Sequence, residues 1–403
     1  MLGNAGSLQG VRVIHAATSA NMLTAFGRVM AERIVDEGAD LYLVASSRPI
    51  YGRPADIDEL RAIGGKPITV PLENNLQPWN LIANTGRLYR IFRTIQPHVV
   101  HTRGSVMGIV GRIAAWLARV PCVVHHQDDL HAREGTLSPM KRRVSSAIER
   151  AFANRTQQTF VVSREVAAAA EGIGFKAELL CNVGHDLSPF IRAAASETPQ
   201  SRERHPLLCD FGISSEHFVV GAITRLEPHK GIDTLIHAAE MVKQQCPSVR
   251  FVVRGRGPEK GRLTQMINEL ELGDRFILLE EWLSGNDLIR LYRSFDIFAL
   301  PTRREGFGMA FAEAMFLGVV PIAPNIAPVN EVVTSRTGIL VEPTAAGFSE
   351  AVRWAVNHPE AVESLRDSAQ QEAEHRWGGT QAADKVIASY QSILSEENIQ
   401  PGK

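Results

Sequence analysis

The chain has 403 residues, a length that favours two or three domains, each able to bury a full core. The composition is ordinary for a globular protein, with 44% hydrophobic and 22% charged residues, and a net charge of -1 argues against a nucleic-acid partner. The four cysteines are widely separated without a C-x-x-C pair, which argues against a zinc site or a disulfide scaffold.

Targeting signals are absent from the sequence pattern. Residues 1–10 lack the basic and apolar regions of a signal peptide. No apolar run approaches the ~20 residues that a membrane-spanning helix needs. We therefore expect a cytoplasmic protein, with peripheral contact at the inner membrane face as an alternative left open.

The first half alternates between strand and helix patterns. Strands are predicted at residues 11–16, 41–45, 68–70, 99–100 and 122–126, with helices at 30–36, 82–95 and 106–118 between them. Such alternation indicates a parallel sheet with helices on both faces. The loop predicted at 17–21 contains Thr18 and would lie where open α/β sheets bind ligands; the alternative interpretation is a loop that only turns tightly.

A second loop is predicted at residues 101–105, and polar residues crowd the next strand end. Three histidines and two aspartates, Asp128 and Asp129 among them, lie within residues 125–131. They could suggest a metal site, but no second cluster at i, i+4 spacing supports one.

Residues 139–154 are predicted to form a long helix with several cations. These are Lys141, Arg142, Arg143 and Arg150, followed by Arg155, while an earlier helix carries Arg87, Arg90 and Arg93. Two interpretations remain open. One is a solvated helix face, and the other is a surface that meets anionic lipid or a lipid-linked phosphate.

A polar segment at about 193–205 indicates a linker, and a second βαβ series begins at Phe218. Its first strand is followed by Arg225 and Lys230, and a helix begins at Ile232. Two cations held at one strand end suit a diphosphate whose charge grows as it leaves. Considered alone, the pair could also be ordinary surface charges.

The central stretch, residues 301–314, follows a buried strand predicted at 295–300 and leads into a helix that ends near Gly318. Gly306, Phe307, Gly308 and Met309 form a loop whose amides can hold an anion. Glu305 and Glu313 frame this loop, and carboxylates accept hydrogen bonds from hydroxyl groups. Phosphate on the amides and hydroxyls on the acids suggest a sugar nucleotide. The alternative is a helix N-terminus that merely favours acids.

Glu305 and Glu313 resemble the E-x7-E signature of the family 4 retaining glycosyltransferases. Residues 221–231 resemble the family's G-x-x-x-R-L-x-x-x-K-G segment, and residues 110–115, 255–259 and 337–343 match further motifs. The resemblance implies an α/β protein of the GT-B type, with two Rossmann-like domains facing across a cleft. We expect these domains at 1–192 and 206–376, with a helix that begins at Trp377 and a C-terminal segment of about 380–403 packing back on the first.

The chain also departs from the family pattern. Asp128 and Asp129 stand where the family has a histidine-glycine pair, and no D-x-D metal clamp of the other large glycosyltransferase architecture is recognisable. A glycine pair is missing near Asn325, and residues 181–186 resemble the family's N-G-V-D turn with two residues transposed and one added.

The resemblance implies transfer of a sugar from a nucleoside diphosphate sugar, with UDP-sugar favoured, to a saccharide, lipid-linked or small-molecule acceptor, with retention and without a metal or cofactor. The implied catalytic residues are Arg225, Lys230, Glu305 and Asp128. The implied donor-binding residues are Gly306, Phe307, Gly308, Met309, Glu313, Thr18 and Arg256. In this assignment Arg225 and Lys230 hold the diphosphate, Glu305 binds sugar hydroxyls and Glu313 binds the ribose.

Three other functions remain open from the sequence. A sugar-nucleotide epimerase or a phosphorylase could share the architecture, although no lysine-bound pyridoxal site of a phosphorylase is identifiable. A non-catalytic partner subunit is also possible, because Asp128 and the missing glycine pair fall where the family does its chemistry. The presence of Arg225, Lys230, Glu305 and Glu313 argues against lost activity.

Overall fold

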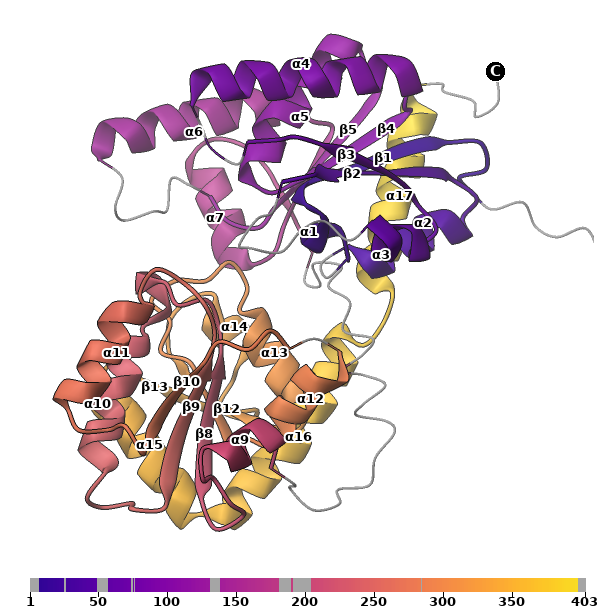
Figure 1. Ribbon diagram of the computed structural model, residues 1–403. Coiled ribbons are helices and arrows are strands. Elements are labelled where there is room, and N and C mark those ends of the chain that lie inside the picture. The colour runs from indigo at the N-terminus through magenta and orange to yellow at the C-terminus, as the bar shows by residue number, and fades with distance from the viewer. Residues whose placement is uncertain are drawn as a thin grey trace, which may run out of the picture. The chain divides into compact units, whose positions relative to one another are not determined.

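The computed structural model describes residues 7–397 apart from 25–26, 49–56, 74, 76, 131–137, 181–189, 191–203 and 284. The chain forms two compact units (Figure 1). Unit 1 consists of Met1–Asp186 and Gly379–Lys403, and unit 2 consists of Leu187–Gly378. The turn expected at 181–186, most of the expected linker and His131 lie outside the described residues.

Unit 1 is built on a seven-stranded parallel sheet in the order β3-β2-β1-β4-β5-β6-β7. The strands are β1 (Arg12–Ser19), β2 (Asp40–Ser46), β3 (Lys66–Val70), β4 (Val99–Arg103), β5 (Cys122–Gln127), β6 (Gln158–Val161) and β7 (Glu178–Leu179). The helices are α1 (Ala20–Thr24), α2 (Arg28–Asp36), α3 (Ile57–Ala62), α4 (Pro78–Ile95), α5 (Ser105–Ala118), α6 (Pro139–Ala153), α7 (Arg164–Gly172) and α17 (Gln381–Glu396). The strand order reverses between β1 and β4, which makes this a doubly wound sheet.

Alternating side chains of these strands supply two separate cores. Val13 and Leu43 pack with α2, α3 and α17, whereas their neighbours Ile14 and Val44 pack with α4 and α5 on the opposite face. Because side chains alternate along a strand, a central strand buried on both faces reads as a continuous apolar run. This explains why the strands were visible in the sequence.

The C-terminal helix α17 completes unit 1. Its Ala383, Val386, Ile387 and Tyr390 belong to the same buried cluster as α2. Arg33 Nε donates a hydrogen bond to Asp384 Oδ1 at 2.9 Å, and Lys385 Nζ lies 2.8 Å from Glu178 Oε1. Residues from opposite ends of the chain therefore share one hydrophobic core.

Unit 2 contains a six-stranded parallel sheet in the order β10-β9-β8-β11-β12-β13. The strands are β8 (Phe218–Ile223), β9 (Val249–Arg254), β10 (Phe276–Leu279), β11 (Ile297–Ala299), β12 (Val320–Pro324) and β13 (Ile339–Val341). The helices are α9 (Pro206–Asp210), η2 (Pro228–Lys230), α10 (Ile232–Val242), α11 (Lys260–Glu269), α12 (Asn286–Arg293), α13 (Met309–Phe316), α14 (Val329–Val332), α15 (Ala345–Asn357) and α16 (Pro359–Trp377). Here the order reverses between β8 and β11.

Local signals explain several helix ends in both units. Ser163 accepts a hydrogen bond from the Val166 amide at the start of α7, and Thr344 accepts one from the Gly347 amide at the start of α15. Gly318 follows α13 with a φ of 66°, the left-handed conformation in which glycine commonly ends a helix, as expected.

The predicted α/β architecture with two parallel sheets is confirmed, and three local predictions are wrong. The loop expected at 17–21 is instead the end of β1 and the start of α1, and β4 continues through Arg103 rather than ending at Val100. Trp377 ends α16, and α17 begins at Gln381. The first two errors have one cause, because polar residues at the end of a fully buried strand do not look like strand residues.

Candidate active site

The strongest candidate site lies in unit 2, where its sheet order reverses. Parallel strands β8 and β11 are neighbours, and the segments that follow them both leave the carboxyl edge of the sheet. Open α/β sheets bind ligands at such a reversal, because the adjacent loops diverge to opposite faces and leave a crevice. Arg225 and Lys230 follow β8, and Glu305 to Met309 follow β11.

The two loops are tied together by hydrogen bonds. The His229 carbonyl accepts a hydrogen bond from the Arg303 amide at 2.7 Å, and the Thr302 hydroxyl lies 3.2 Å from the same oxygen. Gly231 has a φ of 69°, and a Cβ there would lie 1.9 Å from the Pro301 carbonyl oxygen. A glycine is required at this close approach, because any side chain would push the loops apart.

Lys230 and Glu305 meet across this junction. Lys230 Nζ lies 2.7 Å from Glu305 Oε1, and each side chain is 12% exposed. Arg225, by contrast, is exposed and hydrogen-bonds Glu227. Burial and the adjacent Lys230 charge lower the pKa of His229, so this imidazole stays neutral near neutral pH. The cations of the site are therefore Lys230 and Arg225 rather than the histidine, and each lies beside a carboxylate.

The glycine-bearing loop enters α13 through Gly308, which has a φ of 100° and precedes the first helical residue, Met309. Phe307 is buried, and its ring meets that of Trp377 edge to face at 5.7 Å. The aromatic anchor fixes the loop, and the first amides of α13 have no helical acceptor. Gly306 and the α13 amides can thus receive an anion.

Glu313 lies on α13 and is held by a tyrosine from α12. The buried Tyr292 hydroxyl donates a hydrogen bond to Glu313 Oε2 at 2.6 Å. Burial and the Glu313 charge raise the pKa of Tyr292 well above its ordinary value, so the phenol remains a donor. Sequence analysis did not identify Tyr292, and no local pattern distinguishes it from other apolar positions of α12.

The turn after β9 contributes Arg256 to the same sheet edge. Arg256 is exposed, and its Nε donates to the Glu280 carbonyl at 2.6 Å. The Arg256 carbonyl accepts a hydrogen bond from the Leu226 amide at 2.8 Å, and a Cβ at Gly257 would lie 2.2 Å from the Leu226 carbonyl oxygen. The turn is therefore locked beside the Arg225 segment.

Unit 1 holds the remaining two predicted residues, Thr18 and Asp128. Thr18 is buried near the end of β1, and a Cβ on Gly104 would lie 3.4 Å from its hydroxyl. Asp128 follows β5 and is gripped by Arg103 through Nη2 at 2.9 Å and Nε at 3.4 Å. Arg103 is 1% exposed, so its position is fixed. The sequence pattern places Arg103 in a loop and does not identify its contact with Asp128.

Histidines accumulate in the interior of unit 1. His15, His101, His125 and His126 lie in three central strands and are buried. The His101 ring is 5.0 Å from that of His15, and its Nδ1 lies 2.6 Å from the Tyr390 hydroxyl. Burial lowers the pKa of all four, that of His15 to about 3. Among the described residues no group of three or more potential ligands is arranged to hold a metal ion.

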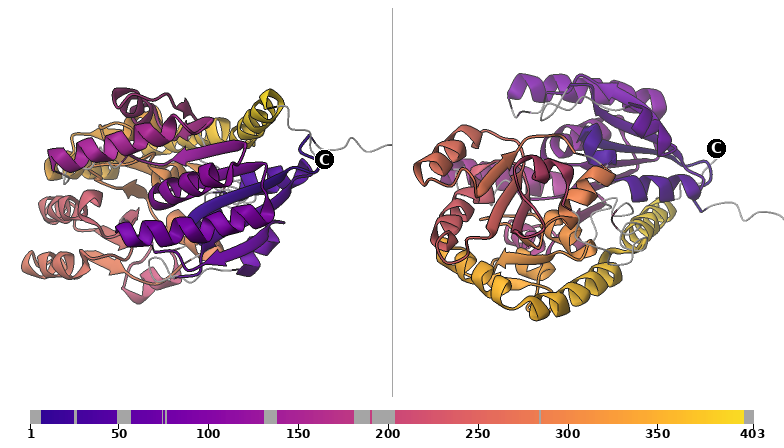
Figure 2. Two further views of the ribbon diagram at one scale, coloured as in Figure 1. Left: turned by 90° about the horizontal axis from the view of Figure 1, so that it is seen from above. Right: turned by 60° about the horizontal axis from the view of Figure 1, so that its bottom comes forward.

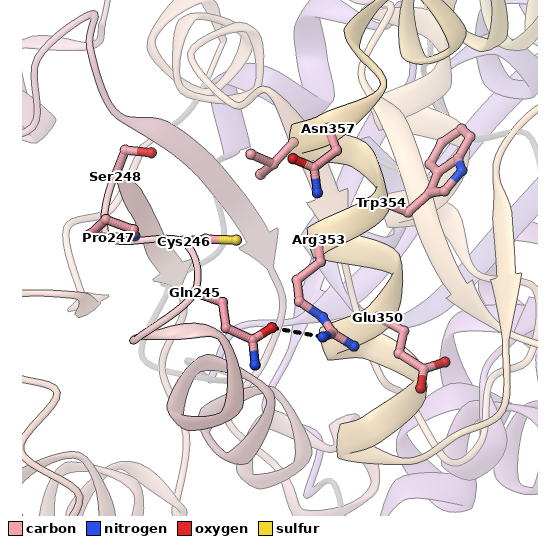
Figure 3. A pocket seen from close by; sticks show the side chains of 9 residues that line it. Gln245, Cys246, Pro247, Ser248, Glu350, Arg353, Trp354 and Asn357 are labelled. Carbon is pink, nitrogen blue, oxygen red and sulfur yellow. Dashed lines mark hydrogen bonds between the residues drawn. The ribbon is translucent and has the colours of Figure 1, made fainter.

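A recess of about 440 Å³ lies elsewhere in unit 2 and contains none of the predicted site residues. It is lined by Cys246 and Pro247 before β9 and by Arg353 and Trp354 on α15 (Figure 3). Arg353 Nη1 donates to Gln245 Oε1 at 2.7 Å, which closes one side of it. The segment before β9 is at the amino edge of the sheet, away from the loops that carry Lys230 and Glu305.

Comparison with protein families gives a match for each unit. The family described as "Glycosyl transferases group 1" matches residues 210–372, and the one described as "Glycosyl transferase 4-like domain" matches residues 24–184. The chain belongs to the group 1, family 4-type glycosyltransferases. Between them the two matches cover most of its length.

Named relatives of this glycosyltransferase agree with that assignment. This chain is 27% identical over 352 residues to D-inositol 3-phosphate glycosyltransferase of Mycolicibacterium smegmatis. The aligned region covers 81% of this chain and 75% of the relative. The chain is 30% identical over 263 residues to UDP-Gal:alpha-D-GlcNAc-diphosphoundecaprenol alpha-1,3-galactosyltransferase of Escherichia coli, covering 63% of this chain and 65% of the relative.

Solved structures establish the GT-B fold of this glycosyltransferase. Anabaena HepE, in complex with UDP and glucose, has a TM-score of 0.77 at 18% identity and covers 95% of this chain and 99% of its own. Sucrose-phosphate synthase from Thermosynechococcus elongatus has a TM-score of 0.76 at 16% identity, covering 96% and 100%. Across the described part of this chain, every helix is too short or too polar to cross a bilayer.

Proposed function

We propose that this glycosyltransferase transfers a sugar from a nucleoside diphosphate sugar, with UDP-sugar as the first candidate, and retains the anomeric configuration. The observation that carries the proposal is the Lys230–Glu305 contact at the β8–β11 reversal, with the α13 amides on the same loop. A cation, helix amides and a carboxylate at one sheet edge suit a ligand that carries both phosphates and hydroxyls. The UDP-Gal in the name of the E. coli relative supports the choice of nucleotide.

Each residue then has a distinct part in the reaction. Lys230 and Arg225 balance the charge that grows on the departing diphosphate, and the α13 amides add their dipoles. Glu305 orients the sugar through its hydroxyls. The positive charge of Lys230 reduces the repulsion between this carboxylate and the anionic donor. Glu313, fixed by Tyr292, accepts hydrogen bonds from the ribose.

Retention is proposed to proceed by front-side attack. A double displacement needs a nucleophilic side chain beside the anomeric carbon, and no residue of the sequence stands out for that part. In front-side attack the departing phosphate accepts the acceptor's proton, which makes the diphosphate clamp the main catalytic device. We also propose that this clamp replaces a metal ion, so chelators should leave the rate unchanged.

The acceptor is proposed to be a saccharide or a lipid-linked or small molecule, with peripheral membrane contact through the basic helices of unit 1. The undecaprenol-linked substrate in the name of the E. coli relative supports a lipid-linked acceptor. Asp128, which Arg103 holds in one orientation, is proposed to contact the reacting groups.

A thermal-shift screen against UDP-, GDP- and ADP-sugars tests the donor. The matching nucleotide should stabilise the protein by about 2.7 kcal/mol at a hundredfold excess over its dissociation constant. NMR of the product with that donor then reports the anomeric configuration. Stabilisation by no nucleotide sugar, or an inverted product, would overturn the proposal.

Lys230→Ala tests the clamp directly. We expect turnover to fall by about 10² or more, as loss of a preorganised charge stabiliser commonly does. Lys176→Ala, which removes an exposed lysine of unit 1, is the control and should leave turnover unchanged. Equal rates for both variants, at matched melting temperatures, would remove Lys230 from the mechanism.

A further inference from the structure

One layer of unit 1 has an unusual distribution of charge. Helices α4, α5 and α6 contain a single acidic residue, Glu149. That acid is turned inward, where its Oε2 lies 3.0 Å from Arg112 Nη2 and both side chains are buried. The outer surface of the three helices therefore carries no carboxylate.

Seven exposed arginines lie on or directly beyond these helices, and none forms an ion pair within the described parts of the chain. They are Arg90, Arg93, Arg119, Arg142, Arg143, Arg150 and Arg155. Some exposed cations elsewhere are paired: Arg303 of unit 2, for example, lies 2.8 Å from Asp233. Among the described residues, no carboxylate pairs with these arginines, and such a field attracts an anionic partner.

Large apolar side chains are exposed among these arginines. Met140 is 74% exposed, Ile82 74%, Trp79 65% and Trp116 58%. Trp116 lies next to a cation, with the Arg155 guanidinium 5.7 Å from its ring centre. Exposed aromatic and aliphatic groups beside arginines are what the interface of a bilayer accepts, since the apolar groups enter it while the cations meet phosphates.

The geometry places these groups on one side of the sheet. Helices α4, α5 and α6 run next to one another over the same face of unit 1 (Figure 1), and Figure 2 shows them side by side from above. Beyond α6, a groove of about 710 Å³ separates it from the end of α7. Arg142, Arg143, Arg150 and Arg155 line this groove, with Gly172 and Ile173 on its other wall. Four guanidinium groups around one recess suit a phosphate group.

We infer that the α4–α6 face docks this glycosyltransferase on an anionic phospholipid bilayer, with a lipid phosphate in the α6–α7 groove. This deepens the proposed membrane contact and rests on the proposed function for its purpose, because a lipid-linked acceptor would then be presented at the surface where the enzyme sits. Docking itself requires no sugar donor, so it can be tested apart from transfer.

The test is cosedimentation with vesicles of phosphatidylglycerol and phosphatidylcholine, compared with phosphatidylcholine alone. The protein should bind the anionic vesicles at low salt and detach as salt rises, because exposed charges are screened beyond ~8 Å at physiological ionic strength. Each arginine removed should weaken partitioning of the protein onto the vesicles roughly fivefold. The double variant Arg142→Gln with Arg150→Gln should therefore partition about 30-fold more weakly.

Matched variants separate the specific face from general charge. Arg290→Gln with Arg336→Gln removes two exposed arginines of unit 2 and should leave binding unchanged. Trp116→Ser with Met140→Ser should weaken vesicle binding while keeping its salt dependence. Absence of binding to anionic vesicles at low salt, or equal losses in both arginine pairs, would overturn the docking face.

A polyanion control decides between lipid and other anions. Suppose that the protein binds duplex DNA as tightly as the anionic vesicles, and that Trp116→Ser with Met140→Ser alters neither affinity. The surface is then a general anion binder and the lipid assignment is wrong. Transfer to a water-soluble acceptor, measured in parallel, should be equal in all variants. Absence of sugar transfer by the unaltered protein would count against the proposed transfer and not against docking.

Discussion

Glu305 and Glu313 belong to one loop and helix, yet their partners differ. Glu305 meets the ammonium group of Lys230, whereas Glu313 accepts a hydrogen bond from the buried Tyr292 phenol. A charged partner leaves Glu305 responsive to the charge of a bound donor. The neutral, fully buried phenol of Tyr292 orients the Glu313 carboxylate without adding charge beside it.

The two acids should therefore fail in different ways. Glu313→Gln should raise the donor KM more than it lowers kcat, because contacts to the ribose are the same in the ground and transition states. Glu305→Gln should mainly lower kcat, because the sugar that it orients gains positive character as its bond to phosphate breaks. Steady-state kinetics with one donor measures both, and a reversed pattern would mean that the roles are wrongly assigned.

Tyr292→Phe extends this comparison to a positioning residue. Removal of the phenol should shift the donor KM in the same direction as Glu313→Gln but by a smaller factor, since the carboxylate remains and only its orientation is loosened. A fall in kcat without any change in KM would show that Tyr292 acts elsewhere.

At the scale of elements, the site depends on how closely two loops approach. The segment after β8 reaches the segment after β11 at Gly231, where the Pro301 carbonyl fills the space that a Cβ would need. The Arg303 amide bond to the His229 carbonyl then fixes the register of the two loops. Lys230 and Glu305 meet because of this contact between backbones.

Gly231→Ala should therefore separate the loops and disable the site. We expect a loss of turnover of at least about tenfold together with a lower melting temperature, because both the clash and the φ of 69° oppose a side chain. Gly273→Ala is the matched control, since nothing lies within 4 Å of its added Cβ. Wild-type turnover in Gly231→Ala would show that the close approach is unimportant.

At the scale of the molecule, buried histidines make the stability of unit 1 sensitive to acid. Four histidines are buried with lowered pKa values, and both ring nitrogens of His15 and His126 lack a hydrogen-bond partner among the residues that the structure describes. The Arg103 guanidinium adds positive charge beside the cluster, and this charge disfavours an imidazolium. These histidines therefore remain neutral in the folded protein.

The free energy of unfolding should decrease as the pH is lowered. Below the unfolded-state pKa of about 6.5 the unfolded chain binds protons that the folded chain does not, so stability is present above that value and declines toward the folded pKa values. Each histidine contributes a slope of up to about 1.4 kcal/mol per pH unit. His15, with a folded pKa of about 3, should contribute between pH values of about 6.5 and 3.

Denaturant unfolding at several pH values measures this slope. His15→Leu should flatten it, whereas His237→Gln, which removes an exposed histidine, should leave it unchanged. Equal slopes for His15→Leu and the unaltered protein would contradict the prediction.

Much of the architecture could be predicted because its signals are local. β2 and β5 lie within one residue of the predicted bounds at each end, and α6 ends within one residue of its prediction, since continuous apolar runs and helical spacing are legible within a few residues. The Gly306–Met309 loop at the start of α13 was likewise legible from its glycines. Arg103 and the end of β1 were not, because polar residues at a buried strand end look like loop residues.

The amino-acid order thus decided which residues form strands, loops and helix starts in this glycosyltransferase, because those choices rest on side-chain spacing and glycine positions. The folded units decided which of these residues meet. Lys230 with Glu305, Tyr292 with Glu313 and Arg103 with Asp128 are contacts between separate elements. Such pairs arise when packing of the whole sheet brings distant strand ends to one edge, and no short stretch of sequence records that packing.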